Sequence, residues 1–406
     1  MKASRRAVPD GARPGSVALV RGAVVALTTA LVSVTGLLAF LAGRAARQVV
    51  TPAARVADTR LVDVDTAAQT ITLDRTAQTV LPGRYGLFTT GTQDYLKLGT
   101  VLTADDATVT RKLLTQIGAD DRLSGAAAFS GWYFTRPEEL HLPFESISVP
   151  TSLGPAPAWV FPAPAPTDVW AIHVHGRGTT RSESLRAVPV FHAAGITSLI
   201  ASYRNDGEAP PSAGGTSALG ATEWSDIDQA IASARRRGAR RVVLFGWSMG
   251  GAVVLQVALN SAHRDLIAGI VLDSPVVDWR QVLTHQARLM GLPGPLAKVA
   301  LDALGRSWAG RLTGSDVAIP FDELDLVSRA AELTSPTLIL HSNGDDFVPP
   351  DASRLLHAAR PELVEFEEFE VAGHTKLWNY DEERWAAAVH GWLARHGLTG
   401  AAVAGS

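Results

Sequence analysis

The second half of the chain alternates short apolar runs with amphipathic stretches, and this alternation constrains the fold more than any other feature. The runs have strand length, and the stretches between them carry apolar residues at helical spacing. Strands joined through helices pair in parallel, and helices then cover both faces of the sheet. The sequence therefore predicts a doubly wound, mostly parallel α/β sheet, with strands at 169–174, 198–203, 242–245, 267–272 and 337–340, an edge strand at 364–371, and helices at 183–194, 223–236, 249–262, 352–359 and 381–396.

A serine flanked by glycines stands at the end of one predicted strand. The motif Gly246-Trp247-Ser248-Met249-Gly250 follows the apolar run 241–245 and precedes a helical stretch. An abrupt turn from strand to helix strains the backbone at the turn, and flanking glycines remove Cβ clashes there. We expect Ser248 to stand exposed at a positively polarised helix N-terminus, with the backbone N–H of Met249 facing a developing oxyanion.

This strand, turn and helix resemble the nucleophile elbow of the α/β-hydrolase superfamily, and residues 145–396 are similar to its catalytic domain. In that family a His-Gly loop completes the oxyanion hole, and here His175-Gly176-Arg177 stands in the matching place. The resemblance implies that Arg177 supplies the second backbone N–H and that no cofactor is needed. The segment 203–207 also resembles S9- and S33-type serine peptidases and membrane-anchored lipid or thioester hydrolases.

A serine hydroxyl needs a base to take its proton, and the base needs an acid to orient it. His374 follows the predicted edge strand, after Gly373, and is the expected base. The family's acid loop resembles the segment that begins at His341, which makes Asp345 the first choice for the acid. The adjacent Asp346 and the strand-terminal Asp273 are the alternatives.

Residues 277–331 are longer than a simple crossover requires, and we expect them to form a cap over the pocket. Their apolar side chains either favour acyl groups in the site or pack the cap onto its own domain.

His173 and His175 share one face of a strand, as two metal ligands would. No third ligand of matching spacing follows, so the sequence predicts no metal site.

The remaining composition mainly excludes classes of protein. A net charge of -3 gives no reason to expect a nucleic-acid partner. The absence of cysteine excludes disulfides and thiolate nucleophiles.

Residues 56–140 contain short alternating runs separated by turns and predict a small β-rich module, which is too short for a propeller of four-stranded blades.

The N-terminal region carries a long apolar run. Residues 22–43 contain no charge, and a helix of that length crosses a hydrocarbon core of about 30 Å. A cleaved signal peptide is the alternative, but its apolar region is usually about 7 to 15 residues long. Residues 1–21 form a basic tail, so we expect a single-pass cell-membrane anchor with the catalytic domain outside the cytoplasm.

These features together predict a membrane-anchored serine hydrolase that cleaves carboxylic ester or thioester bonds through an acyl-enzyme. The substrates expected are small esters, lipids or peptides. A serine peptidase of S9 or S33 type is the alternative. A catalytically inert binding module is a further alternative, and a missing member of the triad would be its sign.

Overall fold

The computed structural model describes residues 21, 27–28, 33, 36, 40–52, 55, 57–89, 95–118, 125–315 and 317–400. The predicted basic tail and most of the predicted span 22–43 lie outside these residues. Within the described part of the chain, no helix has the length and apolar character needed to cross a membrane.

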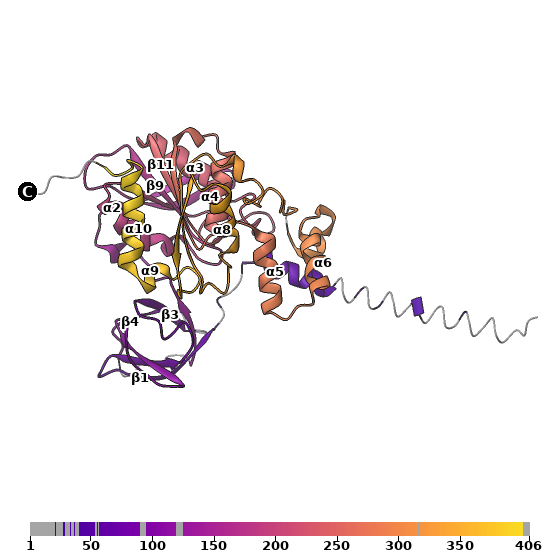
Figure 1. The fold of residues 1–406 in the computed structure, drawn as a ribbon, viewed down its shortest axis with the longest axis horizontal. Helices are drawn as coiled ribbons and strands as arrows, with labels where there is room; N and C mark the ends of the chain where they lie inside the picture. Colours follow the sequence, from indigo (N-terminus) through magenta and orange to yellow (C-terminus); the bar gives the residue numbers. More distant parts are fainter. Residues whose placement is uncertain are drawn as a thin grey trace, which may run out of the picture.

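Six antiparallel strands close into a small barrel in the region where the sequence predicts a β-rich module (Figure 1). Around the barrel the strands follow the order β1-β2-β5-β4-β3-β6, and β6 pairs with β1 to close it. Ile71, Leu87 and Phe129 are among the apolar side chains that fill its interior. The strands are Thr59–Asp65 (β1), Thr70–Asp74 (β2), Tyr85–Thr89 (β3), Tyr95–Ala104 (β4), Thr108–Leu113 (β5) and Ala126–Ser130 (β6).

An eight-stranded sheet forms the centre of the larger domain, in the order β14-β13-β12-β11-β9-β10-β8-β7. The β7–β8 and β8–β10 pairs are antiparallel, and the other pairs are parallel. The expected edge strand, β14, lies at one edge of the sheet. The strands are Glu145–Thr151 (β7), Gly154–Phe161 (β8), Val169–Val174 (β9), Thr197–Ala201 (β10), Arg241–Trp247 (β11), Ile267–Asp273 (β12), Thr337–Ser342 (β13) and Val364–Phe369 (β14).

Helices cover both faces of this sheet, which confirms the doubly wound architecture. Along β11, Val242 and Leu244 pack into one apolar cluster with α3 and α4, and Val243 and Phe245 pack into the other with α2 and α10. The helices are Val188–Ala193 (α2), Trp224–Arg236 (α3), Met249–Asn260 (α4), Asp351–Ala359 (α8), Leu377–Tyr380 (α9) and Glu382–Arg395 (α10), with 3-10 turns at Pro137–Leu140 (η1), Arg264–Leu266 (η3) and Ala330–Glu332 (η5).

The helix predicted at 183–194 is only partly α-helical. Its first half is a 3-10 helix, Arg181–Ala187 (η2), and the α-helix α2 begins at Val188. Pro189 has no N–H to donate to the carbonyl of Leu185, so an α-helix cannot run through this point but can begin there. Proline at the second position of α2 therefore sets the boundary.

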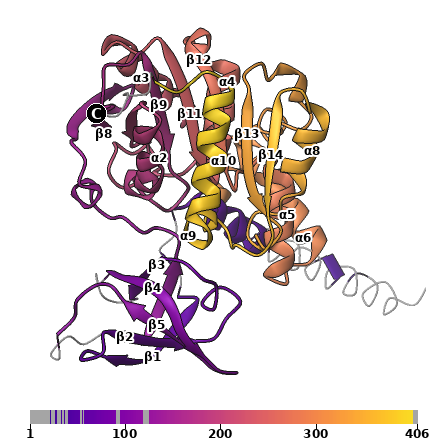
Figure 2. The same cartoon turned by 60° about the vertical axis from the view of Figure 1, so that its left-hand side comes forward.

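The segment predicted to form a cap contains Trp279–Leu289 (α5) and Gly294–Leu304 (α6), followed by Ser307–Ala309 (η4) and Gly310–Thr313 (α7). Residues 40–50 form a helix, here called the N-terminal helix, which lies beside α5 and α6 (Figures 1 and 2). Its Ala42, Ala46 and Val50 form one buried stripe at four-residue spacing. They belong to the same apolar cluster as Leu283 of α5 and Leu304 of α6. The N-terminal helix is therefore part of the folded domain.

Candidate active site

Ser248 lies at the junction of β11 and α4, where the sequence predicts a sharp turn. Its backbone is strained, with φ 52° and ψ -118°. The two flanking glycines are required by close contacts. A Cβ on Gly246 would lie 2.6 Å from the carbonyl oxygen of Gly250, and a Cβ on Gly250 would lie 2.2 Å from that of Val174. Glycine therefore allows the strand and the helix to meet at the serine.

The structure brings Ser248, His374 and Asp345 into one hydrogen-bonded chain. The hydroxyl of Ser248 donates to Nε2 of His374 at 2.8 Å. The Nδ1–H of His374 donates to Oδ2 of Asp345 at 2.7 Å. Asp345 lies in the loop after β13 and His374 in the loop after β14, so the sheet sets the positions of all three.

Asp345 is held as a carboxylate by its neighbours. Burial alone would raise its pKa, but the charge of His374 and the hydrogen bonds from His341 and His374 lower it below the ordinary value. The backbone amides of Phe347 and Val348 donate to Oδ1 at 3.1 and 2.8 Å. His341 also donates to the carbonyl of Val348 at 2.9 Å, and thus fixes the loop as well as the acid.

The other two candidate acids lie elsewhere. Asp346 is exposed. Asp273 is buried at the end of β12, where Nε1 of Trp385 donates to it at 2.8 Å and the hydroxyl of Ser274 at 2.9 Å. Burial raises the pKa of Asp273 to about 6. Of the three candidates, Asp345 is the one that bonds to His374.

Met249 and Arg177 line a cavity of about 130 Å³ together with Ser248 and His374. Met249 is the first residue of α4, and the first amides of a helix have no acceptor within it. Gly176 lies against the nucleophile, since a Cβ there would be 3.3 Å from the Cβ of Ser248. The structure thus places both predicted oxyanion residues beside the serine.

Two side chains that the sequence did not single out hold the loop of Gly176. A carboxylate oxygen of Glu183 accepts from the amide of Gly176 at 2.9 Å and from the hydroxyl of Thr179 at 2.7 Å. The hydroxyl of Tyr203 donates to the carbonyl of His175 at 2.9 Å. Glu183 lies in η2 and Tyr203 in the loop that follows β10, so no local pattern identifies them.

His173 and His175 have separate partners. His173 bonds to the hydroxyl of Ser198 at 3.0 Å, and burial lowers its pKa to about 3. His175 contacts Asp206 at 3.2 Å. Burial alone would raise the pKa of Asp206, but the hydrogen bond from His175 lowers it. Over the part of the chain that the structure covers, no three metal-ligating side chains gather in one place.

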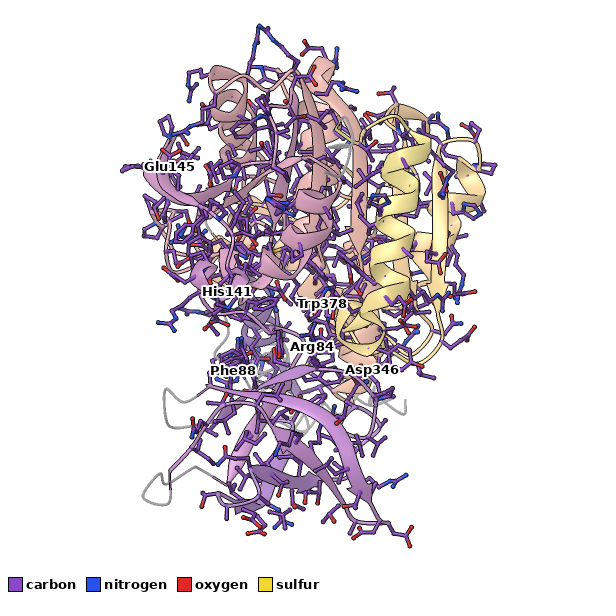
Figure 3. All side chains as sticks on the ribbon, turned by 90° about the vertical axis from the view of Figure 1, so that its left-hand side faces the viewer. Arg84, Phe88, His141, Glu145, Asp346 and Trp378 are labelled. Carbon is purple, nitrogen blue, oxygen red and sulfur yellow. The ribbon has the colours of Figure 1, made fainter. Side chains whose placement is uncertain are left out.

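The barrel contacts the loop that carries His374. A Cβ on Gly373 would lie 2.1 Å from the side-chain oxygen of Gln78, so the two segments are in van der Waals contact. From the other side, Arg186 donates to the carbonyl of Thr375 at 2.8 Å. Figure 3 shows the barrel residue Arg84 and Trp378 where the barrel and the sheet domain meet, and the guanidinium carbon of Arg84 lies 5.3 Å from the ring centroid of Trp378.

Comparison with known proteins agrees with this architecture. A family model described as "Alpha/beta hydrolase family" matches residues 171–389, and a model described as "Domain of unknown function (DUF8805)" matches residues 60–130, which form the barrel. A search of curated proteins found no match.

The chain is similar to solved structures of low sequence identity. An esterase from Pyrococcus furiosus has a TM-score of 0.51 at 15% identity, covering 64% of this chain and 94% of that chain. A monoacylglycerol lipase from Paleococcus ferrophilus has a TM-score of 0.42 at 21% identity, covering 59% and 99%. The family match spans more than half of the sequence, and the chain belongs to the alpha/beta hydrolase family, with the serine, histidine and aspartate arrangement of a serine hydrolase.

Proposed function

We propose that this protein cleaves carboxylic ester or thioester bonds through an acyl-enzyme. The observation that carries the proposal is the chain of hydrogen bonds from Ser248 through His374 to Asp345, at 2.8 and 2.7 Å. A serine so placed has a base within reach of its proton, and the base has a carboxylate that stabilises its charged form.

In the first half of the reaction, Oγ of Ser248 attacks the carbonyl carbon and Nε2 of His374 takes the hydroxyl proton. The carbonyl oxygen becomes an oxyanion, which the backbone N–H groups of Met249 and Arg177 stabilise. His374 then gives its proton to the departing alcohol or thiol as the acyl–oxygen or acyl–sulfur bond breaks. Asp345 stabilises the imidazolium throughout.

In the second half, water replaces the leaving group. His374 takes a proton from the water as its oxygen attacks the acyl carbon, and then returns this proton to Oγ of Ser248 as the acyl–serine bond breaks. The products are a carboxylic acid and free enzyme. This chain's own residues supply the nucleophile, the base, the acid and the oxyanion donors, and water is the second substrate.

Ester chemistry is favoured over peptide chemistry by what precedes the catalytic domain. Peptidases of the S9 type usually carry a large propeller there, whereas this chain carries a barrel of six strands.

We also propose that residues 22–43 anchor the protein in the cell membrane, with the catalytic domain outside the cytoplasm. The uncharged length of this run supports the anchor, and N-terminal sequencing of the membrane-bound protein tests it, because a start near Ala46 would mean cleavage.

A fluorophosphonate probe tests the nucleophile. The wild-type protein is expected to be labelled and Ser248→Ala is not, with kcat reduced about a million-fold. Labelling that survives Ser248→Ala would refute Ser248 as the nucleophile, and an unlabelled wild type would favour the inert module. Activity on p-nitrophenyl esters compared with aminoacyl and peptide amides then separates an esterase from a peptidase.

A further inference from the structure

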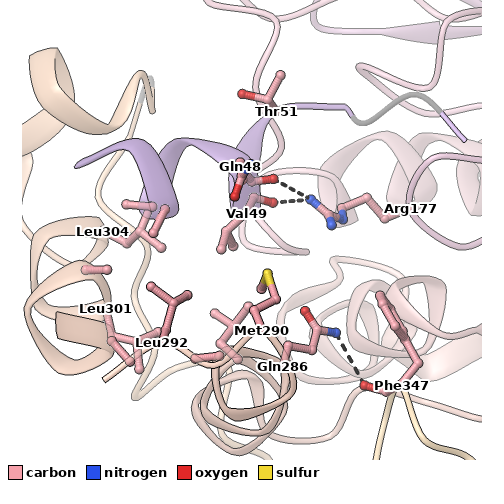
Figure 4. Close-up of a pocket in the computed structure, with 16 residues that line it drawn as sticks. Gln48, Val49, Thr51, Arg177, Gln286, Met290, Leu292, Leu301, Leu304 and Phe347 are labelled. Atoms are coloured by element: carbon pink, nitrogen blue, oxygen red, sulfur yellow. Dashed lines mark hydrogen bonds between the residues drawn. The ribbon is translucent and has the colours of Figure 1, made fainter. Parts of the chain in front are cut away.

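A second cavity, of about 420 Å³ (Figure 4), shares lining residues with the cavity of Ser248. The N-terminal helix forms one wall of this second cavity through Ala45 and Val49. The cap helices α5 and α6 form the other walls. A volume of this size lies within the range of small-molecule sites, about 300–1,000 Å³.

The second cavity borders directly on the triad cavity. Arg177, Gln286 and Phe347 line both. Nε2 of Gln286 donates to the carbonyl of Phe347 at 3.3 Å, so these two residues form one side of the border, while Arg177 belongs to the other. A molecule whose carbonyl lies at Ser248 therefore has a neighbouring space for the group attached to that carbonyl.

The walls of the second cavity are mainly aliphatic. Leu283 comes from α5, Met290 directly follows α5, and Ala297, Leu301 and Leu304 come from α6. Figure 4 shows Met290, Leu292, Leu301 and Leu304 on the side away from Arg177, facing the N-terminal helix. Such walls provide few hydrogen-bonding partners, so the group that gains most by entering is a hydrocarbon group. Methionine adapts its shape readily to a chain of variable length.

Arg177 connects the N-terminal helix to the oxyanion site. Its guanidinium donates to the carbonyl oxygen of Val49, which lies in the last turn of the N-terminal helix. Carbonyl groups in the last turn of a helix accept no hydrogen bond from the helix itself, so they are free to accept one from outside. The same residue lines the triad cavity beside Met249. The helix that forms a wall of the second cavity is thus fastened to the loop that faces the reacting carbonyl.

We propose that the second cavity binds the hydrocarbon chain of a medium- to long-chain acyl ester or thioester, and that the N-terminal helix is a part of this binding site. The proposal rests on the proposed function, because it places the acyl carbonyl at Ser248. The apolar walls and the shared border with the cavity of Ser248 favour the acyl chain as the occupant.

The test compares p-nitrophenyl esters from acetate to decanoate on the full-length protein in detergent. Each methylene that enters the cavity is expected to raise kcat/KM by about fourfold until the space is filled. Ala297→Phe places a ring in the cavity and is expected to reduce the ratio of decanoate to acetate activity more than tenfold. Val299→Phe is the matched control, since Val299 lies on the same helix but is exposed.

Ala45→Phe, which fills the cavity from the N-terminal helix, is expected to act like Ala297→Phe. Fluorophosphonate labelling of each variant shows that Ser248 and His374 remain assembled. A labelled wild type with no chain-length preference, or labelled variants whose preference matches that of Val299→Phe, would overturn the acyl-chain proposal and leave the hydrolase intact. An unlabelled wild type would instead overturn the proposed function.

Discussion

Arg84 and Asn379 are joined by two reciprocal hydrogen bonds that connect the barrel to the segment following His374. The amide of Arg84 donates to the carbonyl of Asn379 at 3.2 Å, and the side-chain amide of Asn379 donates to the carbonyl of Arg84 at 2.7 Å. Asn379 also accepts from the buried Arg186 at 2.7 Å. The barrel therefore bonds directly to α9, the short helix that follows the loop carrying His374.

Gly83→Ala tests whether this contact positions His374. A Cβ at Gly83 would lie 1.8 Å from the carbonyl oxygen of Asn379, so the barrel must shift. Gly238→Ala is the control, because Gly238 has a similar φ, 108° against 103°, but nothing within 4 Å of its Cβ. We expect Gly83→Ala to lower the unfolding free energy by about 1–3 kcal/mol more than the control and to lower kcat with little change in KM. Equal effects of the two substitutions would mean that the contact plays no such role.

Asp345→Asn and Asp346→Asn separate the two adjacent carboxylates. An amide at position 345 does not stabilise the imidazolium of His374, so kcat is expected to fall by about 10⁴-fold. Asp346→Asn retains the main-chain carbonyl to which His285 bonds at 2.9 Å, and its kcat is expected to stay within a few-fold of wild type. Steady-state kinetics on a p-nitrophenyl ester measures both, and a larger loss at 346 would assign the acid to that residue.

Asp273→Asn isolates the effect of a buried carboxyl on stability. Burial raises the pKa of Asp273 to about 6 from 3.8. Between these values the folded protein holds a proton that the unfolded chain has lost, so the unfolding free energy decreases as pH rises. From pH 4 to pH 7, the unfolding free energy of the wild type is expected to fall by up to about 3 kcal/mol relative to that of Asp273→Asn. Urea unfolding at each pH measures the difference, from which the contribution of Asp345 cancels because both proteins contain it. A pH-independent difference would contradict the raised pKa.

Tyr203→Phe tests a positioning residue of the oxyanion loop. The hydroxyl of Tyr203 donates to the carbonyls of His175 and Gly176, at 2.9 and 3.2 Å, and the latter carbonyl belongs to the peptide bond that supplies the N–H of Arg177. Phenylalanine retains the ring stacked on His175. We expect kcat to fall about tenfold with KM nearly unchanged, as the loss of one buried hydrogen bond allows. A change confined to thermal stability would show that the hydroxyl only supports the fold.

The sequence predicts features that depend on neighbouring residues. The sharp turn at Ser248 follows from a strand, two glycines and a helix in immediate succession, and the sheet follows from alternation along the chain. The order of Ser248, Asp345 and His374 comes from the family resemblance. Pro189 lies at the start of α2, and because proline has no N–H this boundary is also encoded by neighbouring residues.

Other features depend on contacts between distant segments. The sequence predicts Glu183 only as the first residue of a helix, whereas in the structure its carboxylate accepts a hydrogen bond from the amide of Gly176. The sequence predicts His341 at the start of the loop that carries the acid, but it does not predict that the ring of His341 contacts Asp345, at 3.3 Å. The contact of Gln78 with Gly373 joins two domains. Each of these pairings is set by how the whole chain packs, so spacing along the sequence gives no indication of it.

The buried stripe of Ala42, Ala46 and Val50 has a consequence for maturation of the protein. A processing peptidase that cut near Ala46 would remove Ala42 from the hydrophobic core and leave the rest of the stripe at a frayed chain end. Recombinant versions that begin at the barrel would lose the whole stripe and expose the apolar side chains of α5 and α6 that belong to the same cluster, such as Leu283 and Leu304. The N-terminal helix and the catalytic domain are therefore not separable parts, and measurements on such shortened proteins would describe a different enzyme.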